Sequence, residues 1–449
     1  MLKKILTTLL LISVMNSFSQ DVITGKMNPA GNYSWMILYK LNGVSQSYVQ
    51  NTTVKDGKFS ITIPKGSEPG MYRLSYDNIN NRFIDVIYNK ENIDLEFHPE
   101  HPIELVKFTK SKENMLFQDY IREIADVNNS LDSLQVVYFN EKGKSKKTEN
   151  LYSKKLKLSN SIQDTYEKKS TDKLSNHFIK ANKRYFTTKL IKDKNAYLKS
   201  LKAHFFDYVD FNNQTLSKSS LLIDRILKYV FLLNTSNDPK MLLKLREDAV
   251  NTVVSKIHNI DLKKDVIESL MYTFAQKENT VMVKSLIQNH FNKLPVALQD
   301  YKFKNAVLDM VKTTIGQMAP EITWEEKGET KNLYSLKGSE YYIVLFWSST
   351  CSHCLKELPV LHKYLKDKPN VKVVAIGLET NQSKYDWIDL KYDYDDFIHI
   401  MGENKYKNQY VRDYGVSSTP NFFLLNSDKK IIAKPYDVKK LKAFFNSKK

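Results

Sequence analysis

The sequence predicts a multidomain protein with an all-β N-terminal domain, an all-α middle region and an α/β C-terminal domain. Turn-forming glycines are concentrated near the start, where six of the thirteen lie between Gly25 and Gly70. Residues 109–311 contain a single glycine, Gly143, a composition that long helices tolerate well. From Gly316 onward, short apolar strand-like runs are separated by helical stretches, which is typical of an α/β domain.

The chain begins with the features of a secretory signal peptide. Lys3 and Lys4 give a positive start, a ten-residue apolar stretch follows, and small residues precede Gln20, so we expect removal of residues 1–19 on export. A buried core helix is the alternative, but it does not explain why these features occur together. No stretch reaches the roughly eighteen apolar residues of a membrane span, and no cysteine follows the cleavage point to carry a lipid. We therefore expect an exported, soluble protein without stable membrane insertion.

Residues 20–108 predict a β-sandwich-like domain. After the Asp56–Gly57 turn signal, residues 59–63 alternate between apolar and polar side chains, and residues 82–88 and 92–97 have the composition of further strands. No cluster of titratable side chains in this region indicates catalysis.

Residues 109–311 predict a helical domain, with an apolar stripe along residues 220–234 and a break between two long helices at residues 141–147. This region holds 35 basic and 23 acidic side chains and so carries most of the net charge of +18. Because export is expected and no nucleic-acid recognition motif is present, we interpret the excess as solvated helix faces and expect no nucleic-acid partner.

Residues 312–449 predict an α/β domain that opens with a βαβ unit. The expected elements are a strand at 341–347, a helix at 354–365, a strand at 371–377, a helix near 406–414, strands at 421–425 and 430–433, and a terminal helix.

The only two cysteines stand at the start of the first of these helices, as Cys351-Ser352-His353-Cys354. Unpaired N–H groups and the helix dipole favour a thiolate there, so we expect Cys351 to be the nucleophile and Cys354 to resolve the mixed disulfide. An inert structural disulfide and a metal site are the alternatives. Two cysteines cannot form a four-thiolate zinc site, and so short a loop removes little unfolded-state entropy, so we favour redox chemistry without a metal or cofactor.

The residues around this pair resemble the TlpA/ResA-like branch of the thioredoxin superfamily. The similarity rests on FWSSTCSHCLKELP at residues 346–359 and YGVSSTP at residues 414–420, and it covers about residues 312–449. It implies a thioredoxin-like fold and a thiol-disulfide oxidoreductase, with Pro420 as a cis-proline beside the cysteine pair. It also implies that Trp347, His353 and Thr419 contact the substrate.

Proton transfer is where the chain departs from thioredoxin itself. Thioredoxin has a buried acid six residues before its first cysteine, a position that Leu345 occupies here. The TlpA/ResA-like branch instead has a glutamate three residues after the second cysteine, where Glu357 stands, and nearly one helical turn would place it on the face of Cys354. An imidazolium at His353 would stabilise the thiolate. The alternatives are a surface glutamate and a solvent-exposed histidine.

The resemblance favours a reductase of the periplasm or cell envelope that acts in cytochrome c-type biogenesis. Its partners would be protein thiol or disulfide substrates and a membrane-bound electron donor. The N-terminal domain more weakly resembles a domain of unknown function found in Gram-negative envelope proteins. About 290 residues lie outside the redox region, so an envelope binding or scaffold protein remains an alternative. A thiol peroxidase would need a proline and a threonine where Val344 and Ser348 stand.

Overall fold

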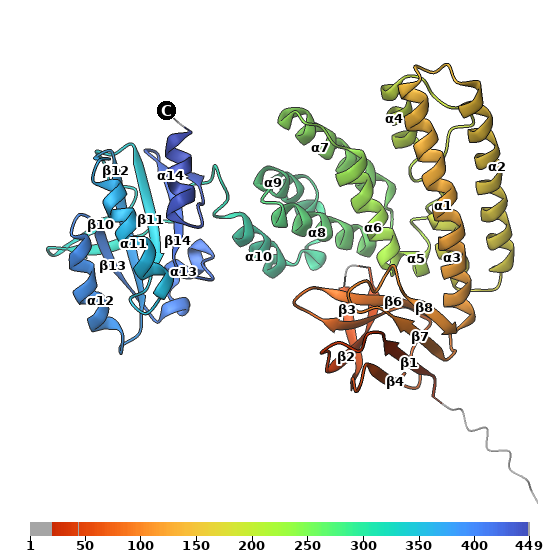
Figure 1. The fold of residues 1–449 in the computed structure, drawn as a ribbon, viewed down its shortest axis with the longest axis horizontal. Helices are drawn as coiled ribbons and strands as arrows, with labels where there is room; N and C mark the ends of the chain where they lie inside the picture. Colours follow the sequence, from red (N-terminus) through yellow and green to blue (C-terminus); the bar gives the residue numbers. More distant parts are fainter. Residues whose placement is uncertain (1–19, 44, 448–449) are drawn as a thin grey trace, which may run out of the picture. The chain divides into compact units, whose positions relative to one another are not determined.

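The computed structural model describes residues 20–43 and 45–447 (Figure 1), so the signal peptide predicted over residues 1–19 lies outside the described part. The chain forms two compact units, one up to Val266 and one from Ile267, and the boundary in the sequence falls within helix α8 (Ile260–Gln276). The predicted order of all-β, all-α and α/β regions is confirmed. Within the described residues, none of the helices has the length and apolar character needed to cross a membrane.

The first unit begins with a β-sandwich of two four-stranded sheets. One sheet has the order β4 (Lys58–Thr62), β1 (Val22–Met27), β7 (Ile93–Phe97) and β8 (Lys107–Lys110), and the other has β3 (Ser45–Thr53), β2 (Trp35–Asn42), β5 (Gly70–Asp77) and β6 (Arg82–Tyr88). Alternate residues of β4 are buried, as the period of two predicts. Both sheets contribute to one apolar core, which includes Ile23, Leu38, Leu74 and Leu95.

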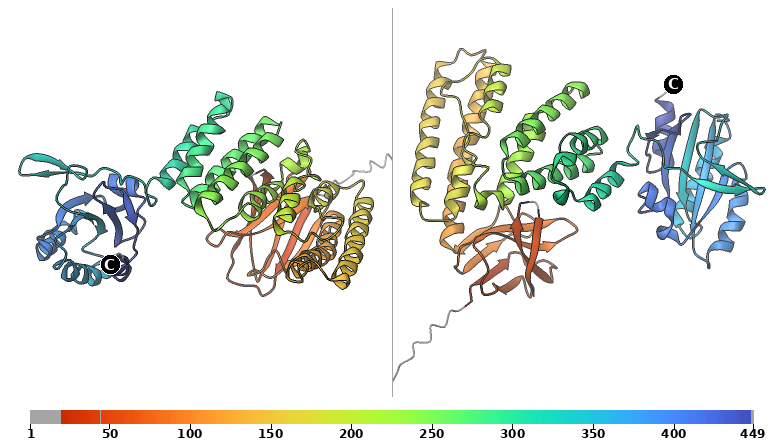
Figure 2. Two further views of the ribbon diagram at one scale, coloured as in Figure 1. Left: turned by 90° about the horizontal axis from the view of Figure 1, so that it is seen from above. Right: turned by 180° about the vertical axis from the view of Figure 1, so that it is seen from behind.

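Helices complete the first unit. They are α1 (Lys112–Asn140), α2 (Lys146–Lys169), α3 (Ser175–Asn182), α4 (Lys194–Ala203), α5 (Gln214–Ser217), α6 (Ser220–Lys228), the π-helical turn η1 (Tyr229–Leu233) and α7 (Pro239–Lys256). The long α1 and α2 lie side by side as a hairpin (Figures 1 and 2), with the expected break between them. The start of α1 is fixed to the sandwich, because the Asn114 side chain exchanges two hydrogen bonds with the Ile87 backbone, at 2.8 and 2.7 Å.

The second unit contains α9 (Thr280–Asn289), the 3-10 turns η2 (Phe291–Lys293) and η3 (Val296–Leu298), α10 (Tyr301–Val311) and then the α/β domain. The predicted helical region is thus divided between the two units, because α1 to α7 pack in the first and α9 and α10 in the second. A two-stranded ribbon of β9 (Thr323–Glu326) and β10 (Glu329–Asn332) projects from the α/β domain (Figure 2).

The α/β domain is built on a five-stranded mixed sheet with the order β13-β12-β11-β14-β15. Its elements are β11 (Tyr341–Trp347), α11 (Ser352–Leu365), β12 (Val371–Glu379), α12 (Lys384–Lys391), the turn η4 (Tyr392–Tyr394), β13 (Ile398–Glu403), the turn η5 (Lys405–Lys407), α13 (Gln409–Tyr414), β14 (Asn421–Asn426), β15 (Ile431–Ala433) and α14 (Val438–Asn446). Strands β11, β12 and β13 are parallel, and β14 and β15 are antiparallel to their neighbours.

The central strand β11 is buried on both faces, which explains its unbroken apolar sequence. Ile343, Leu345 and Trp347 pack on one face with α11 and α14, while Tyr342 and its alternate neighbours pack on the other face with α13. The chain leaves the end of β11 directly into the loop that carries the first cysteine. This central, buried strand therefore positions the start of α11.

Candidate active site

Cys351 is the N-cap residue of α11. Its backbone is extended, with φ −95° and ψ 106°, and its sulfur accepts a hydrogen bond from the backbone N–H of Cys354 at 3.2 Å. Sulfur here takes the place of the hydroxyl or carboxylate oxygen that usually caps a helix. A negative charge on the sulfur lies at the positive end of the helix dipole, which stabilises a thiolate.

The environment of Cys351 lowers the pKa of its thiol. Partial burial acts in the opposite direction, but hydrogen bonds with the Cys354 and Thr419 side chains and with the backbone N–H groups of Cys354 and His353 outweigh it. The structure has the expected cis peptide bond between Thr419 and Pro420, and the Thr419 carbonyl accepts a hydrogen bond from the Cys351 sulfur at 3.4 Å. Two segments that are 68 residues apart in sequence thus meet at the nucleophile.

Cys354 has the opposite environment. Its side chain is fully buried in the apolar cluster that also contains Leu345 and Leu358. Burial, followed by the contact with Cys351, raises the pKa of Cys354 to about 12. Both cysteines are free thiols in this structure, so it represents the reduced pair. The two sulfurs are therefore unequal, one activated and partly exposed, the other protonated and shielded.

The predicted substrate-contact residues fall into different positions. The assignment of Trp347 to substrate contact is corrected, because its side chain is 0 % exposed and packs edge-on against Tyr394 in the core. The His353 side chain is exposed, and the His353 backbone helps to lower the pKa of Cys351 through a hydrogen bond. Thr419 is half-buried and lies with its carbonyl at the cysteine. Of the three, His353 and Thr419 are accessible beside the pair.

Glu357 has a structural partner that its spacing did not predict. The half-buried carboxylate accepts a hydrogen bond through Oε2 from the backbone N–H of Val438 at 2.8 Å, and Val438 is the first residue of α14. Among the hydrogen bonds of residues 20–43 and 45–447, none joins Glu357 to Cys354. The carboxylate therefore compensates an unpaired N–H at the start of a second helix.

A second carboxylate, Glu379, lies beneath the active-site loop and was not predicted. It is the last residue of β12 and is 1 % exposed. Its Oε1 accepts a hydrogen bond from the backbone N–H of Ser349 at 2.6 Å, while Oε2 is buried without a partner. The predicted strand ended at residue 377, two residues too early. An acid at the carboxyl end of a parallel strand, next to a site at the same edge, is the signal that would have found it.

A second contact to this loop comes from Lys405 in the turn η5. Its ammonium donates a hydrogen bond to Thr350 Oγ1 at 3.2 Å, one residue before the nucleophile. Lys405 and Asn404 are consecutive residues with positive φ, 46° and 65°, a conformation that non-glycine residues rarely adopt and that is concentrated at functional sites. The loop before Cys351 is thus fixed by the buried carboxylate of Glu379 and by the ammonium group of Lys405, which lies in the turn after β13.

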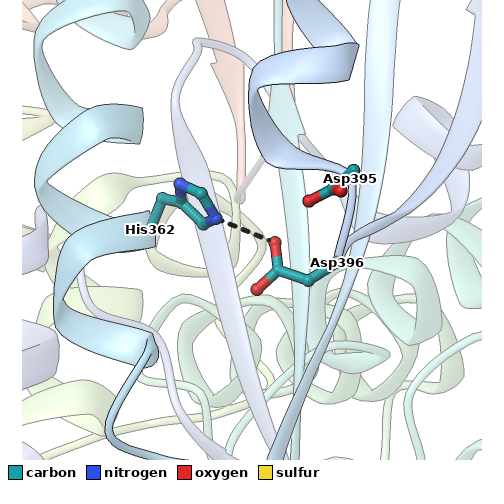
Figure 3. Close-up of side chains that lie close together, drawn as sticks. All are labelled: His362, Asp395 and Asp396. Carbon is teal, nitrogen blue, oxygen red and sulfur yellow. Dashed lines mark ion pairs between the residues drawn. The ribbon is translucent and has the colours of Figure 1, made fainter.

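One group of side chains in the same domain has the composition of a metal site. Ligand atoms of His362, Asp395 and Asp396 all lie within 4.8 Å of one another (Figure 3), and both aspartates are exposed. His362 Nε2 is 3.0 Å from Asp396 Oδ1. An ion pair between these two side chains accounts for the arrangement, so we assign no metal to it.

Comparison with known proteins places the site in a family. Residues 338–431, which include Cys351 and Pro420, match a family model described as thioredoxin-like. The comparison with curated proteins gives no match.

Several solved structures with similarity to parts of this chain come from Bacteroides. The thioredoxin domain of a thiol-disulfide oxidoreductase from Bacteroides vulgatus is 24 % identical over 30 % of this chain and 96 % of its own, with a TM-score of 0.26. A thiol:disulfide interchange protein from Bacteroides sp. is 25 % identical over 30 % of this chain and 90 % of its own, with a TM-score of 0.26. A thioredoxin-like protein from Bacteroides caccae is 17 % identical over 60 % of this chain and 98 % of its own, with a TM-score of 0.38.

The matched segment contains the cysteine pair, the cis-proline and four of the five strands of the mixed sheet in full. The C-terminal part of this chain is therefore a thioredoxin-like domain.

Proposed function

We propose that this protein is an exported thiol-disulfide oxidoreductase of the TlpA/ResA type that reduces disulfides of protein substrates in the periplasm or cell envelope. The observation that carries the proposal is the inequality of the two thiols. Cys351 caps a helix and has a lowered pKa, whereas Cys354 is fully buried with a pKa of about 12. A nucleophile needs the first environment and a resolving thiol tolerates the second.

The reaction proceeds in two exchanges. The Cys351 thiolate attacks one sulfur of the substrate disulfide, forming a mixed disulfide, and the other substrate sulfur leaves and takes a proton. Cys354 then loses its proton and attacks the Cys351 sulfur, which releases the second substrate thiol and leaves a disulfide between Cys351 and Cys354. Two electrons pass to the substrate, so each cycle requires a thiol donor, for which we propose a membrane-bound protein.

We assign the proton of Cys354 to Glu357. Its Oε2 is engaged by the Val438 N–H, so Oε1 is the oxygen available for the proton. The spacing of three residues along α11 supports this assignment, because it is close to one helical turn. The family resemblance favours a substrate protein that takes part in cytochrome c-type biogenesis.

Trapping of mixed disulfides tests the roles of the two cysteines. In Cys354→Ser, Cys351 still attacks and nothing resolves the product, so the variant should accumulate disulfide-linked substrate proteins. The matched variant Cys351→Ser should trap few. Equal trapping by the two variants would reverse or remove the assignment. Failure of the wild-type protein to reduce insulin, together with peroxide consumption, would instead indicate a peroxidase.

The direction of exchange and the location need separate measurements. The reduction potential of the Cys351–Cys354 pair decides whether the protein reduces or oxidises a given substrate, since about 30 mV corresponds to a tenfold change in the equilibrium constant. N-terminal sequencing of the protein from a periplasmic extract should begin at Gln20. A sequence that retains the first nineteen residues would contradict export by a cleaved signal peptide.

A further inference from the structure

A cavity of about 430 Å³ lies among the helices of the first unit, far in sequence from the cysteine pair. Its wall comes from α3, α4, α6 and η1, and most of the side chains in it are apolar, including Phe178, Leu201 and Leu222. The volume falls within the range of roughly 300–1,000 Å³ that is usual for small-molecule sites.

Arg225 brings a cation into the wall of this cavity. Nη2 donates to the carbonyl oxygens of Phe205 at 2.8 Å and Lys183 at 3.1 Å, and the guanidinium lies over the Phe205 ring. Nε is buried without an acceptor. Arg184, in the same wall, has its own partner in Asp132, with both hydrogen bonds at 2.9 Å.

No ion pair of the described residues involves Arg225, and Asp224 is the one acid in the cavity wall. Burial, followed by the charge of Arg184, lowers the pKa of Arg225 to about 10, which leaves it protonated near neutral pH. A shielded cation without a counter-charge is costly, and natural proteins normally pair such groups. The site is therefore electrostatically incomplete as it stands.

The exposed side chains of the cavity wall are Arg184, Asp224, Lys228 and Leu232. Leu232 and Leu233 belong to the π-helical turn η1, which continues α6, and both line the cavity. Leu232 is 70 % exposed, so part of this apolar side chain is open to solvent. Single π-helical turns are frequent at functional sites, because they shift side chains away from the regular helical positions.

We propose that this cavity binds a small amphiphile, a carboxylate with an apolar chain. The carboxylate accepts hydrogen bonds from the Arg225 guanidinium, and the chain lies against the apolar wall and Leu232. Charge complementarity selects an anion, and the mostly apolar wall selects a hydrocarbon rather than a sugar or nucleotide. The binding site is separate from the thiol chemistry.

Calorimetric titration of the full-length reduced protein with decanoate, below its micelle concentration, tests the proposal. We expect saturation at one ligand per chain, and binding roughly tenfold tighter than that of decan-1-ol, because a hydrogen bond to a charged group is the stronger one. Arg225→Met replaces the guanidinium by an apolar side chain of similar length and should remove the preference for decanoate over decan-1-ol.

A second variant covers the case in which Arg225→Met does not fold. Leu232→Asp changes an exposed residue, should fold normally, and should weaken decanoate binding by about tenfold through like-charge repulsion. Leu105→Asp is the matched control, since Leu105 is 55 % exposed outside the cavity wall and should leave binding unchanged. The proposal is overturned if decanoate does not saturate, if decan-1-ol binds equally well, or if Leu232→Asp binds like the control.

Discussion

Selective alkylation gives the sharpest test of the two thiol environments. The environment lowers the pKa of Cys351 from the ordinary thiol value of about 8.5 and raises that of Cys354 to about 12. Since the thiolate is the reactive form, near pH 7 its fraction at Cys351 exceeds that at Cys354 by at least about a thousandfold. The complete burial of Cys354 adds a steric barrier to this difference.

The assay is a short pulse of iodoacetamide on the reduced native protein, followed by mass spectrometry of the peptide that contains both cysteines. We expect label on Cys351 alone, with the Cys351→Ser variant remaining unlabelled over the same pulse. In concentrated urea the two thiols should react at similar rates, which controls for the local sequence. Comparable labelling of both cysteines in the native protein would refute the assignment of roles.

Three further predictions concern the groups around the pair. Glu379→Leu removes the buried acceptor of the Ser349 N–H and should lower the free energy of unfolding of the full chain, measured in urea, by about 1–3 kcal/mol. Glu379→Gln retains an acceptor and is the control, so equal stability of the two variants would contradict this prediction. In the folded state the Cys354 thiol keeps its proton up to a pKa of about 12, whereas in the unfolded chain an ordinary thiol loses it near pH 8.5. Between about pH 9.5 and 11 the free energy of unfolding of the reduced protein should therefore fall by about 1.4 kcal/mol per pH unit relative to that of Cys354→Ala. Parallel plots of stability against pH for the two proteins would contradict this prediction. Glu357→Gln keeps an acceptor for the Val438 N–H but removes the titratable carboxyl group, so the thermal stability should stay near that of the wild type while the pH profile of insulin reduction changes. Superimposable pH profiles would show that Glu357 only caps a helix.

Elements with a clear local pattern could be predicted from the sequence. The strand at 341–347 is found with the predicted bounds, because a strand buried on both faces has an unbroken apolar run between polar ends. The break between α1 and α2 was predicted at the lysine-rich stretch 141–147, which contains Gly143, a residue that disfavours a helix interior.

Contacts between distant segments could not be predicted in this way. The sequence is compatible with either a surface or a core position for Trp347. Its burial follows from packing against Tyr394, which is distant in the sequence. Glu379 follows a strand in the sequence like many surface acids, and its burial results from the position of the Ser349 loop above it. The division of the helices between two units also depends on tertiary packing, which composition does not encode.

The capping of α11 by Cys351 means that one position serves both the chemistry and the architecture of the domain. Each time the sulfur enters a disulfide, the helix exchanges an anionic cap for a neutral one, so the catalytic cycle is also a cycle of local helix stability. Serine at this position would abolish the chemistry while retaining an oxygen able to cap the helix, whereas alanine would remove both. A serine variant therefore reports on lost thiol chemistry alone, and an alanine variant mixes that loss with a weakened helix start.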